Sequence, residues 1–295
     1  MSPGFRRTVI ALIVALGALV ARAVPAAPPV QPELRWTRDA ALLGGGAGLV
    51  GLAGFIDVSV RPVPSQGLDP GDVRWSFDRE QIGRFDTRAL DASDVGSAAA
   101  MAYPMAVAFA CQPPGARIGG TLRRSVVYLE SFLVATGVSM IIKNSTDRPR
   151  PYTYVPADRR PGGSAYDVAA SEAFESMPSS HASSSFCGAA FAMTDHLLSR
   201  PQAGWAERAG VGFAGGLLAG MTATLRVSAG KHFPSDVLAG GAIGFASGVT
   251  VPLAHHYLAP GGRRAQLPPR RAWLQSLGGL GAGIGAGILV ANASY

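Results

Sequence analysis

Three short segments of the sequence combine histidines, a carboxylate and positive charges, which are the side chains that phosphoryl transfer needs. They are KNSTDRPRP (143–151), PSSH (178–181) and RVSAGKHFPSD (226–236). A phosphate monoester carries two negative charges, so guanidinium and ammonium groups must replace the water that it loses on binding. Lys143, Arg150 and Arg226 are therefore candidate phosphate ligands.

The two histidines of these segments suit different steps of such a reaction. A neutral imidazole can attack phosphorus when one ring nitrogen is free and the other donates to an acceptor. Asp236 follows His232 by four residues, and residues at i and i+4 share a helix face, so Asp236 is the predicted acceptor. The leaving alkoxide needs a proton, and His181 is the candidate general acid.

The PSSH segment has two interpretations. Ser179 and Ser180 precede an apolar run, and serine and proline are common where a helix begins, so the segment could be a helix cap only. The free N–H groups at a helix N-terminus also bind anions. In a phosphatase, Ser179 and Ser180 would therefore contribute backbone donors to the phosphate.

Taken in order, Lys-x6-Arg-Pro, Pro-Ser-Ser-His and Arg-x5-His-x3-Asp resemble the three-part signature of the type 2 phosphatidic acid phosphatase superfamily. That superfamily includes membrane lipid phosphatases, periplasmic non-specific acid phosphatases and vanadium haloperoxidases. The resemblance covers about residues 95–258. It implies an all-α helical bundle and hydrolysis without a metal or another cofactor.

The resemblance also implies a role for each matching residue. His232 would be the nucleophile, Asp236 its partner and His181 the general acid. The phosphate ligands would be Lys143, Arg150, Arg226 and the backbone of Ser179 and Ser180. Two positions depart from the family pattern, because Ser180 stands where glycine is usual and Leu225 where serine is usual. The first departure keeps a backbone N–H, whereas the second removes a hydroxyl group from the phosphate shell.

The composition predicts a membrane protein. The chain has 295 residues, of which 48% are hydrophobic and 15% are charged, with a formal net charge of +7, whereas about 25% charged residues are usual in a globular domain. The low charge density, with no Lys/Arg-rich run interleaved with aromatic residues, argues against nucleic acid as a partner. The partners that we expect are the membrane and a phosphorylated lipid.

Apolar runs of helical length predict the elements that position the three segments. They lie at 95–111, 125–142, 182–198, 209–225, 237–254 and 273–291. The connections 112–124, 199–208 and 258–272 are basic and would face the cytoplasm. The loops 143–181 and 226–236 would then lie together on the other side.

The run 41–56 does not fit this alternation if it spans, so we expect it to be an interfacial or packed helix and the protein to have about six transmembrane helices. The run 182–198 contains several serines, Asp195 and His196, which would suit a helix inside a soluble bundle as well. A soluble periplasmic bundle is therefore the alternative.

The N-terminus is typical of a secretory signal peptide. Two arginines precede TVIALIVALGALV (8–20), and small residues follow. The alternative is an uncleaved anchor. We predict a signal peptide (1–26), a periplasmic or interfacial segment (27–94), a catalytic bundle (95–258) and a C-terminal basic loop with an apolar helix (259–295). Cys111 and Cys187 could be buried thiols or form one disulfide.

The sequence also allows predictions for several residues outside the candidate catalytic set. Arg148 and Asp147 should pair or lie in solvent. Lys231, beside His232, could tune the nucleophile or face water, and water is the favoured alternative. His196, His255 and His256 should be structural. Aromatic residues of 75–85 could form an interfacial helix or simply pack. The glycines of LGGLGAGIGAGILV (277–290) suit helix packing within the bundle, and a homodimer is possible.

The function predicted from the sequence is hydrolysis of a lipid phosphate or diphosphate at the periplasmic face of a bacterial inner membrane. The alternatives are a soluble periplasmic acid phosphatase, a vanadium haloperoxidase and a membrane protein that binds anionic lipid without turnover.

Overall fold

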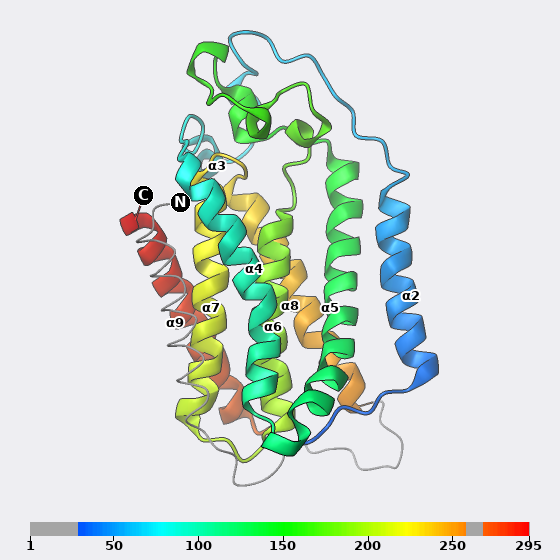
Figure 1. Ribbon diagram of the computed structural model, residues 1–295. Coiled ribbons are helices and arrows are strands. Elements are labelled where there is room, and N and C mark those ends of the chain that lie inside the picture. Colours follow the sequence, from blue (N-terminus) through cyan, green and yellow to red (C-terminus); the bar gives the residue numbers. More distant parts are fainter. Residues whose placement is uncertain (1–28, 258–267, 295) are drawn as a thin grey trace.

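The computed structural model describes residues 29–257 and 268–294, and it contains helices but no strand within these residues (Figure 1). The predicted all-α helical bundle is confirmed. The α-helices are α2 (Trp36–Ala53), α3 (Ser76–Arg79), α4 (Thr87–Ala110), α5 (Arg117–Thr146), α6 (Ser180–Ser199), α7 (Trp205–Ser228), α8 (Pro234–Tyr257) and α9 (Arg270–Ser294). The predicted signal peptide, 1–26, and the domain boundary at 258 lie outside the described residues.

The connections between helices gather at two ends of the bundle. The segments 54–86, 147–179 and 229–233 lie at the upper end in Figure 1, and the turns 111–116 and 199–204 lie at the lower end. The three segments with candidate chemistry therefore meet at the upper end. The basic connections 112–124 and 199–208 begin at the lower end, whereas most of the third, 258–272, lies outside the described residues.

Helix α2 lies beside α5 and runs from the lower end toward the upper end (Figure 1). At its start, the Val30 N–H donates to the Ser199 carbonyl oxygen (2.9 Å), and at its end the Asn144 side chain donates to the Ala53 carbonyl oxygen (2.8 Å). Gly46 faces Leu133 so closely that a Cβ atom there would lie 2.8 Å from the Leu133 Cβ. The run 41–56 is thus a packed helix, and it extends between the two ends.

Helix α6 lies in the middle of the bundle, and α4, α5, α7 and α8 pack around it. Small residues make this possible, since a side chain at Gly188 would collide with the Ala100 carbonyl oxygen. Its polar side chains form hydrogen bonds with neighbouring helices; for example, the Ser139 hydroxyl of α5 donates to Ser183 Oγ at 3.0 Å. Of the polar residues that left the interpretation of 182–198 open, Ser183, Ser185, Thr194 and His196 are buried within the bundle, and Ser184 and Asp195 are partly exposed.

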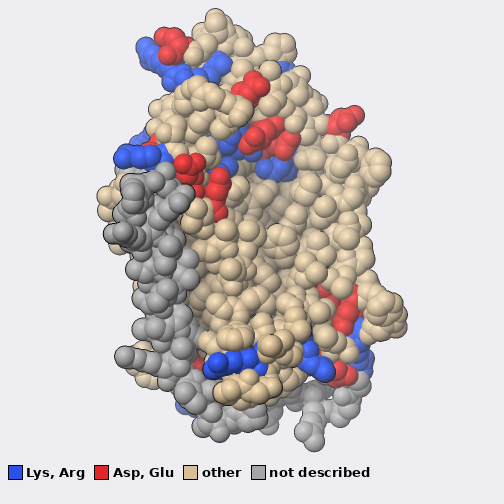
Figure 2. Space-filling view, in the orientation of Figure 1, with Lys and Arg blue, Asp and Glu red and all other residues tan. Residues whose placement is uncertain are grey.

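Four stretches are long and apolar enough to cross a membrane, namely Pro114–Tyr154, Trp205–Ser228, Pro234–His256 and Arg270–Ser294. The expected count of six is not confirmed, because charged residues at the start of α4 and polar residues in α6 lower the hydropathy of these two helices. Figure 2 shows charged side chains at the two ends of the molecule, with a nearly uncharged band between them. This distribution is consistent with a membrane protein.

Helices α7 and α9 touch through glycines. The contact involves Gly212, Gly216 and Gly220 of α7 and Gly279, Gly283 and Gly287 of α9. A Cβ atom at any of these six glycines would collide with the backbone of the opposite helix. We call this contact the glycine seam. The small residues of the C-terminal helix are therefore used within the bundle. The two cysteines, Cys111 in the α4–α5 turn and Cys187 in α6, are buried free thiols.

Candidate active site

The structure brings the predicted site residues together at the upper end of the bundle. Most of them are at helix ends: Lys143 in the last turn of α5, His181 in the first turn of α6, Arg226 in the last turn of α7, His232 just before α8 and Asp236 in its first turn. All of these except His181 are at most 7% exposed. Arg150, which follows α5, is 3% exposed.

His232 has one engaged ring nitrogen. Its Nδ1 lies 2.7 Å from the Ser176 carbonyl oxygen and 3.8 Å from the Asp236 carboxylate. A carbonyl oxygen only accepts, so Nδ1 carries the proton. Among the described residues, none forms a hydrogen bond with Nε2, which is therefore the nitrogen with a free lone pair.

Asp236 supports this arrangement differently from the sequence prediction. Because His232 precedes α8, the two residues do not form a pair along one helix face. Instead, the Asp236 Oδ2 accepts from the Ser176 hydroxyl (2.6 Å) and the Phe233 N–H (2.7 Å). Asp236 thus fixes Ser176, whose carbonyl oxygen fixes His232. Ser176 was missed because it lies 56 residues from His232.

The surroundings of His232 favour its neutral form. Burial, followed by the positive charges of Arg150 and Arg226, holds the pKa of His232 well below its usual range. The ring is therefore uncharged at pH 7, as attack on phosphorus requires.

His181 forms a bridge with Asp94 of α4, which no sequence motif indicated. Its Nε2 lies 2.9 Å from Asp94 Oδ1, and the same oxygen lies 3.3 Å from Arg226 Nη1. Burial and the charge of Arg226 lower the pKa of His181 to about 4, while Asp94 opposes this shift. His181 is thus neutral at pH 7 in the absence of a bound anion.

The predicted phosphate ligands have few fixed partners. Lys143 Nζ donates to the Glu175 carbonyl oxygen (3.0 Å), and Arg226 Nη1 donates to the Ser93 hydroxyl (3.2 Å). The Arg226 Nε is buried, and no described residue accepts from it. Arg150 contacts Glu172 through the backbone oxygen (2.7 Å) and the carboxylate (3.2 Å).

Lys231 is an additional cation of the site. The expectation that it faces water is wrong, because it is 2% exposed and lies over the rings of Tyr152 and Tyr166. Its Nζ lies 3.0 Å from the Glu172 carboxylate. Burial and the charge of Arg150 lower its pKa to about 8. Glu172, whose side chain is 48% exposed, therefore pairs with two of the buried cations.

Arg148 also lies in the site region. The expectation that it pairs with Asp147 or lies in solvent is wrong, because its guanidinium contacts the carboxylates of Asp78 and Asp236. Asp147 instead accepts a hydrogen bond from the Ser59 N–H (3.0 Å).

The N-terminus of α6 offers fewer donors than the PSSH segment predicted. The Ser179 N–H donates to the Asp236 carbonyl oxygen (3.0 Å), so it is not available to a phosphate. The N–H groups of Ser180 and His181 donate to no other group in the described part of the chain. Ser180, in the position where glycine is usual, keeps the predicted backbone donor.

The remaining histidines lie at the lower end. His196 pairs with Glu207 (2.9 Å) and His255 with Glu130 (2.5 Å). Two groups there have the residue types of metal ligands, namely Cys111 with His196 and Glu207, and Asp39 with Glu130 and His255. Ion pairs already join His196 to Glu207 and His255 to Asp39 and Glu130, and neither group includes a residue of the upper site.

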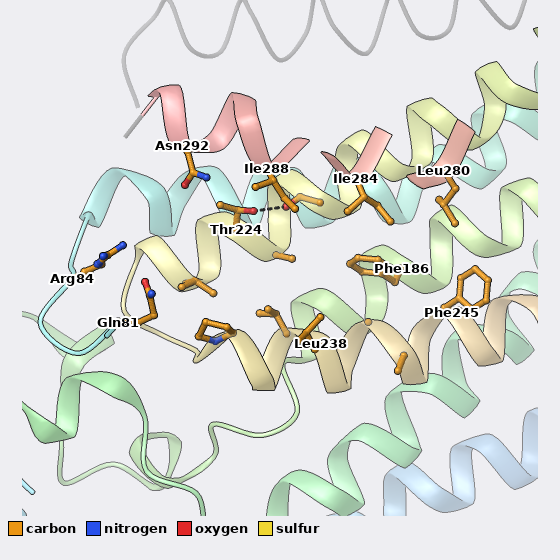
Figure 3. A pocket seen from close by; sticks show the side chains of 17 residues that line it. Gln81, Arg84, Phe186, Thr224, Leu238, Phe245, Leu280, Ile284, Ile288 and Asn292 are labelled. Atoms are coloured by element: carbon orange, nitrogen blue, oxygen red, sulfur yellow. Dashed lines mark hydrogen bonds between the residues drawn. The ribbon is translucent and has the colours of Figure 1, made fainter. Parts of the chain in front are cut away.

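An apolar groove with a volume of about 690 Å³ lies between α7, α8 and α9 (Figure 3). Val227 and Pro234, on either side of the loop that carries His232, belong to its lining. Gln81 and Arg84 lie at the same end of the groove, and Phe186 of α6 points into it between α8 and α9. We call it the α7–α9 groove.

A family model described as the PAP2 superfamily matches residues 124–260. This range contains Lys143, Arg150, His181, Arg226, His232 and Asp236. No match was found among curated proteins or among solved structures. The PAP2 superfamily is a phosphatase family, which supports hydrolysis of phosphoric esters as the general activity. The three segments at the upper end thus lie in the region, residues 124–260, that matches the PAP2 superfamily model, whereas α2, α4 and α9 lie outside it.

Proposed function

We propose that this protein is a membrane phosphatase that hydrolyses a lipid phosphate or diphosphate through a phosphohistidine on His232. The observation that carries the proposal is the neutral, buried ring of His232, whose Nε2 is free and whose neighbours are buried cations. An anion that enters this site meets both a nucleophile and charges that are only partly compensated.

In the first step, His232 Nε2 attacks phosphorus, the bond to the leaving oxygen breaks, and His181 donates a proton to that oxygen. The ring of His232 becomes positively charged and keeps its Nδ1–H bond to the Ser176 carbonyl oxygen. In the second step, His181 accepts a proton from water, which attacks the phosphohistidine. Inorganic phosphate then leaves, and His232 is neutral again.

The protonation state of His181 should depend on whether substrate is bound. Burial and then the charge of Arg226 lower the pKa of His181 in the empty site, and a phosphate dianion would offset the charge of Arg226. Substrate binding would therefore raise the pKa of His181 and favour the protonated form that the first step requires.

Two partly exposed carboxylates, Glu172 and Asp94, now pair with the cations that would hold the phosphate. Each has a side chain that is about half exposed, 48% for Glu172 and 58% for Asp94. A phosphate carries more negative charge than a carboxylate and accepts more hydrogen bonds. We expect the substrate to displace Glu172 from Arg150 and Lys231.

A lipid substrate is supported by the nearly uncharged band on the face shown in Figure 2 and by the α7–α9 groove beside the His232 loop. The groove lining is mainly aliphatic, as a hydrocarbon chain requires. The basic connections at the lower end support a cytoplasmic position for that end and a periplasmic position for the site.

The test is phosphate release by purified protein without added metal, on a lipid diphosphate and on a soluble monoester. His232→Ala should abolish release, whereas His255→Ala, a buried histidine at the other end of α8, should retain it. A denatured sample quenched during turnover should contain acid-labile phosphate on the wild-type protein only. Release that persists in His232→Ala would overturn the phosphohistidine proposal. Preference for the soluble monoester would favour a non-specific acid phosphatase.

A further inference from the structure

Helix α3 carries a carboxylate that is buried although its neighbours are exposed. Trp75 and Phe77 are 38% and 44% exposed and stack on each other, whereas Asp78 is fully buried. Asp78 belongs to the segment between α2 and α4, which precedes the region that the family model matches. A buried carboxylate is retained only when its oxygens are well paired, and its partners here belong to the site.

Asp78 binds the first turn of α8 and Arg148. Its Oδ1 accepts from the Ser235 N–H (3.0 Å), and its Oδ2 accepts from the Ser235 hydroxyl (2.5 Å) and from Arg148 Nη2 (2.9 Å). Asp78 therefore satisfies a free N–H at the start of α8, at the residue next to Asp236.

Arg148 connects Asp78 to Asp236. Its Nη1 donates to the Asp236 carboxylate and to the Ser235 hydroxyl (2.7 Å), and its guanidinium lies 4.7 Å from the centre of the Phe233 ring. Asp236 then uses its other oxygen to hold Ser176, whose carbonyl oxygen accepts from His232 Nδ1. A continuous set of hydrogen bonds thus runs from Asp78 to the ring of His232.

We propose that Asp78, acting through Arg148, is a positioning residue that holds Asp236 away from His232 and keeps Nδ1 on the Ser176 carbonyl oxygen. This inference rests on the proposed function. The segment that carries α3 would then complete the catalytic site from outside the family region. Asp78 anchors Arg148 Nη2, so without its charge the guanidinium is held on one side only and can shift from its position. Asp236, which Arg148 holds through Nη1, could then move with it toward Nδ1, 3.8 Å away.

Loss of Asp78 should shift the pH profile in one direction, which a purely structural role of Asp78 would not do. A carboxylate closer to Nδ1 stabilises the protonated ring, so the acid limb of the pH profile should move to higher pH. The other charged groups that act on His232 are Lys143, Arg150 and Arg226, and the substitution leaves all of them in place.

The experiment compares Asp78→Asn with Glu80→Gln, which changes an exposed acid two residues away. Rates are normalised to folded protein measured by gel filtration in detergent. We expect Asp78→Asn to lower kcat about tenfold to a hundredfold with little change in KM, as for other groups that orient a reacting ligand, and to move the acid limb upward. Glu80→Gln should match the wild type.

Arg148→Lys is the second variant, because an ammonium group cannot bridge two carboxylates as a guanidinium does. It should reproduce the effect of Asp78→Asn, and the double variant should be no worse than the more affected single variant. Wild-type kcat and pH profile in Asp78→Asn, or fully additive losses in the double variant, would overturn the inference. If the wild-type protein itself releases no phosphate, the proposed function has failed, which is a different result.

Discussion

The two ends of helix α8 each hold a buried histidine beside a carboxylate, but only one has a free ring nitrogen. His255, in the last turn, is engaged on both sides, with Nε2 at 2.5 Å from Glu130 and Nδ1 at 2.7 Å from Arg38. His232, before the first turn, is engaged only at Nδ1 within the described structure. Burial and a neighbouring carboxylate therefore do not by themselves distinguish a reactive histidine from a structural one.

The charged groups around the two histidines also differ, because those near His255 are paired with one another and those near His232 include an excess of cations. Near His255, two carboxylates, Asp39 and Glu130, are accompanied by Arg38, and the group joins α2, α5 and α8. Around His232 there are four buried cations from different parts of the chain, namely Lys143, Arg150, Arg226 and Lys231. Two of the carboxylates that accompany them, Asp94 and Glu172, have half-exposed side chains. The upper end can receive an anion, whereas the lower end is already paired internally.

The largest expected effect separates the two histidines directly. His232→Ala should lower kcat by at least about 10³-fold, because no other group replaces the nucleophile. His255→Ala should keep kcat within a few fold but lower the free energy of unfolding by about 3–5 kcal/mol, since Glu130 loses its partner. Steady-state kinetics and thermal denaturation in detergent measure both. Equal loss of kcat in the two folded variants would remove the distinction.

Arg226 tests whether the cations of the upper end act on the phosphate. Its buried Nε has no partner among the described residues, so it is available to an anion. Arg226→Gln should lower kcat/KM about 10²-fold, as loss of one donor to a developing charge does. Arg208→Gln changes a buried arginine at the lower end and should leave kcat/KM nearly unchanged once folded protein is quantified. Similar losses from both variants would contradict the assignment.

The pH profile tests the bridge between His181 and Asp94. The pKa of His181 lies below its usual value, and the negative charge of Asp94 raises it. Asp94→Asn should therefore lower that pKa further and move the alkaline limb of kcat/KM to lower pH, with about a tenfold loss at pH 7 for each unit. Asp91→Asn, an exposed residue one turn earlier in α4, is the control. An alkaline limb that stays in place would exclude His181 as the acid.

The smallest effect concerns the α7–α9 groove. Ala223→Trp should occupy part of the groove and lower kcat/KM for a lipid substrate about tenfold, which is about 1.4 kcal/mol. The same substitution should leave kcat/KM for a soluble monoester nearly unchanged. Leu289→Trp enlarges an exposed side chain of α9 outside the groove lining and should change neither. Equal effects of Ala223→Trp on both substrates would mean that the groove does not hold the lipid chain.

The sequence was sufficient to predict the helical class and the end of the bundle where the three segments meet. Apolar runs have a helical length, and the motifs stand between them, so the order of runs and loops determines which motifs share an end. The same reasoning could not count the spans, because α4 and α6 owe their burial to protein neighbours and not to lipid.

The partners of the site residues could not be predicted. Ser176, Asp94, Glu172 and Asp78 lie in segments without a motif, far along the chain from the side chains that they contact. Their roles follow from how the loops of the upper end cross one another, and residue spacing contains no information about that crossing. For the same reason, the buried contacts of Lys231 and Arg148 could not be predicted, since a lysine or arginine in a loop is exposed in most proteins.

The glycine seam limits how far the α7–α9 groove can widen around a bound molecule. Leu280, Ile284 and Ile288 of α9 form one wall of that groove, and α9 is held to α7 by backbone contact at six glycines. A wall held in this way cannot yield by rotating side chains at the seam, because glycine has none. The spacing of α9 from α7 is therefore set by the main chain, and a bound molecule could widen the groove only on the side of α8.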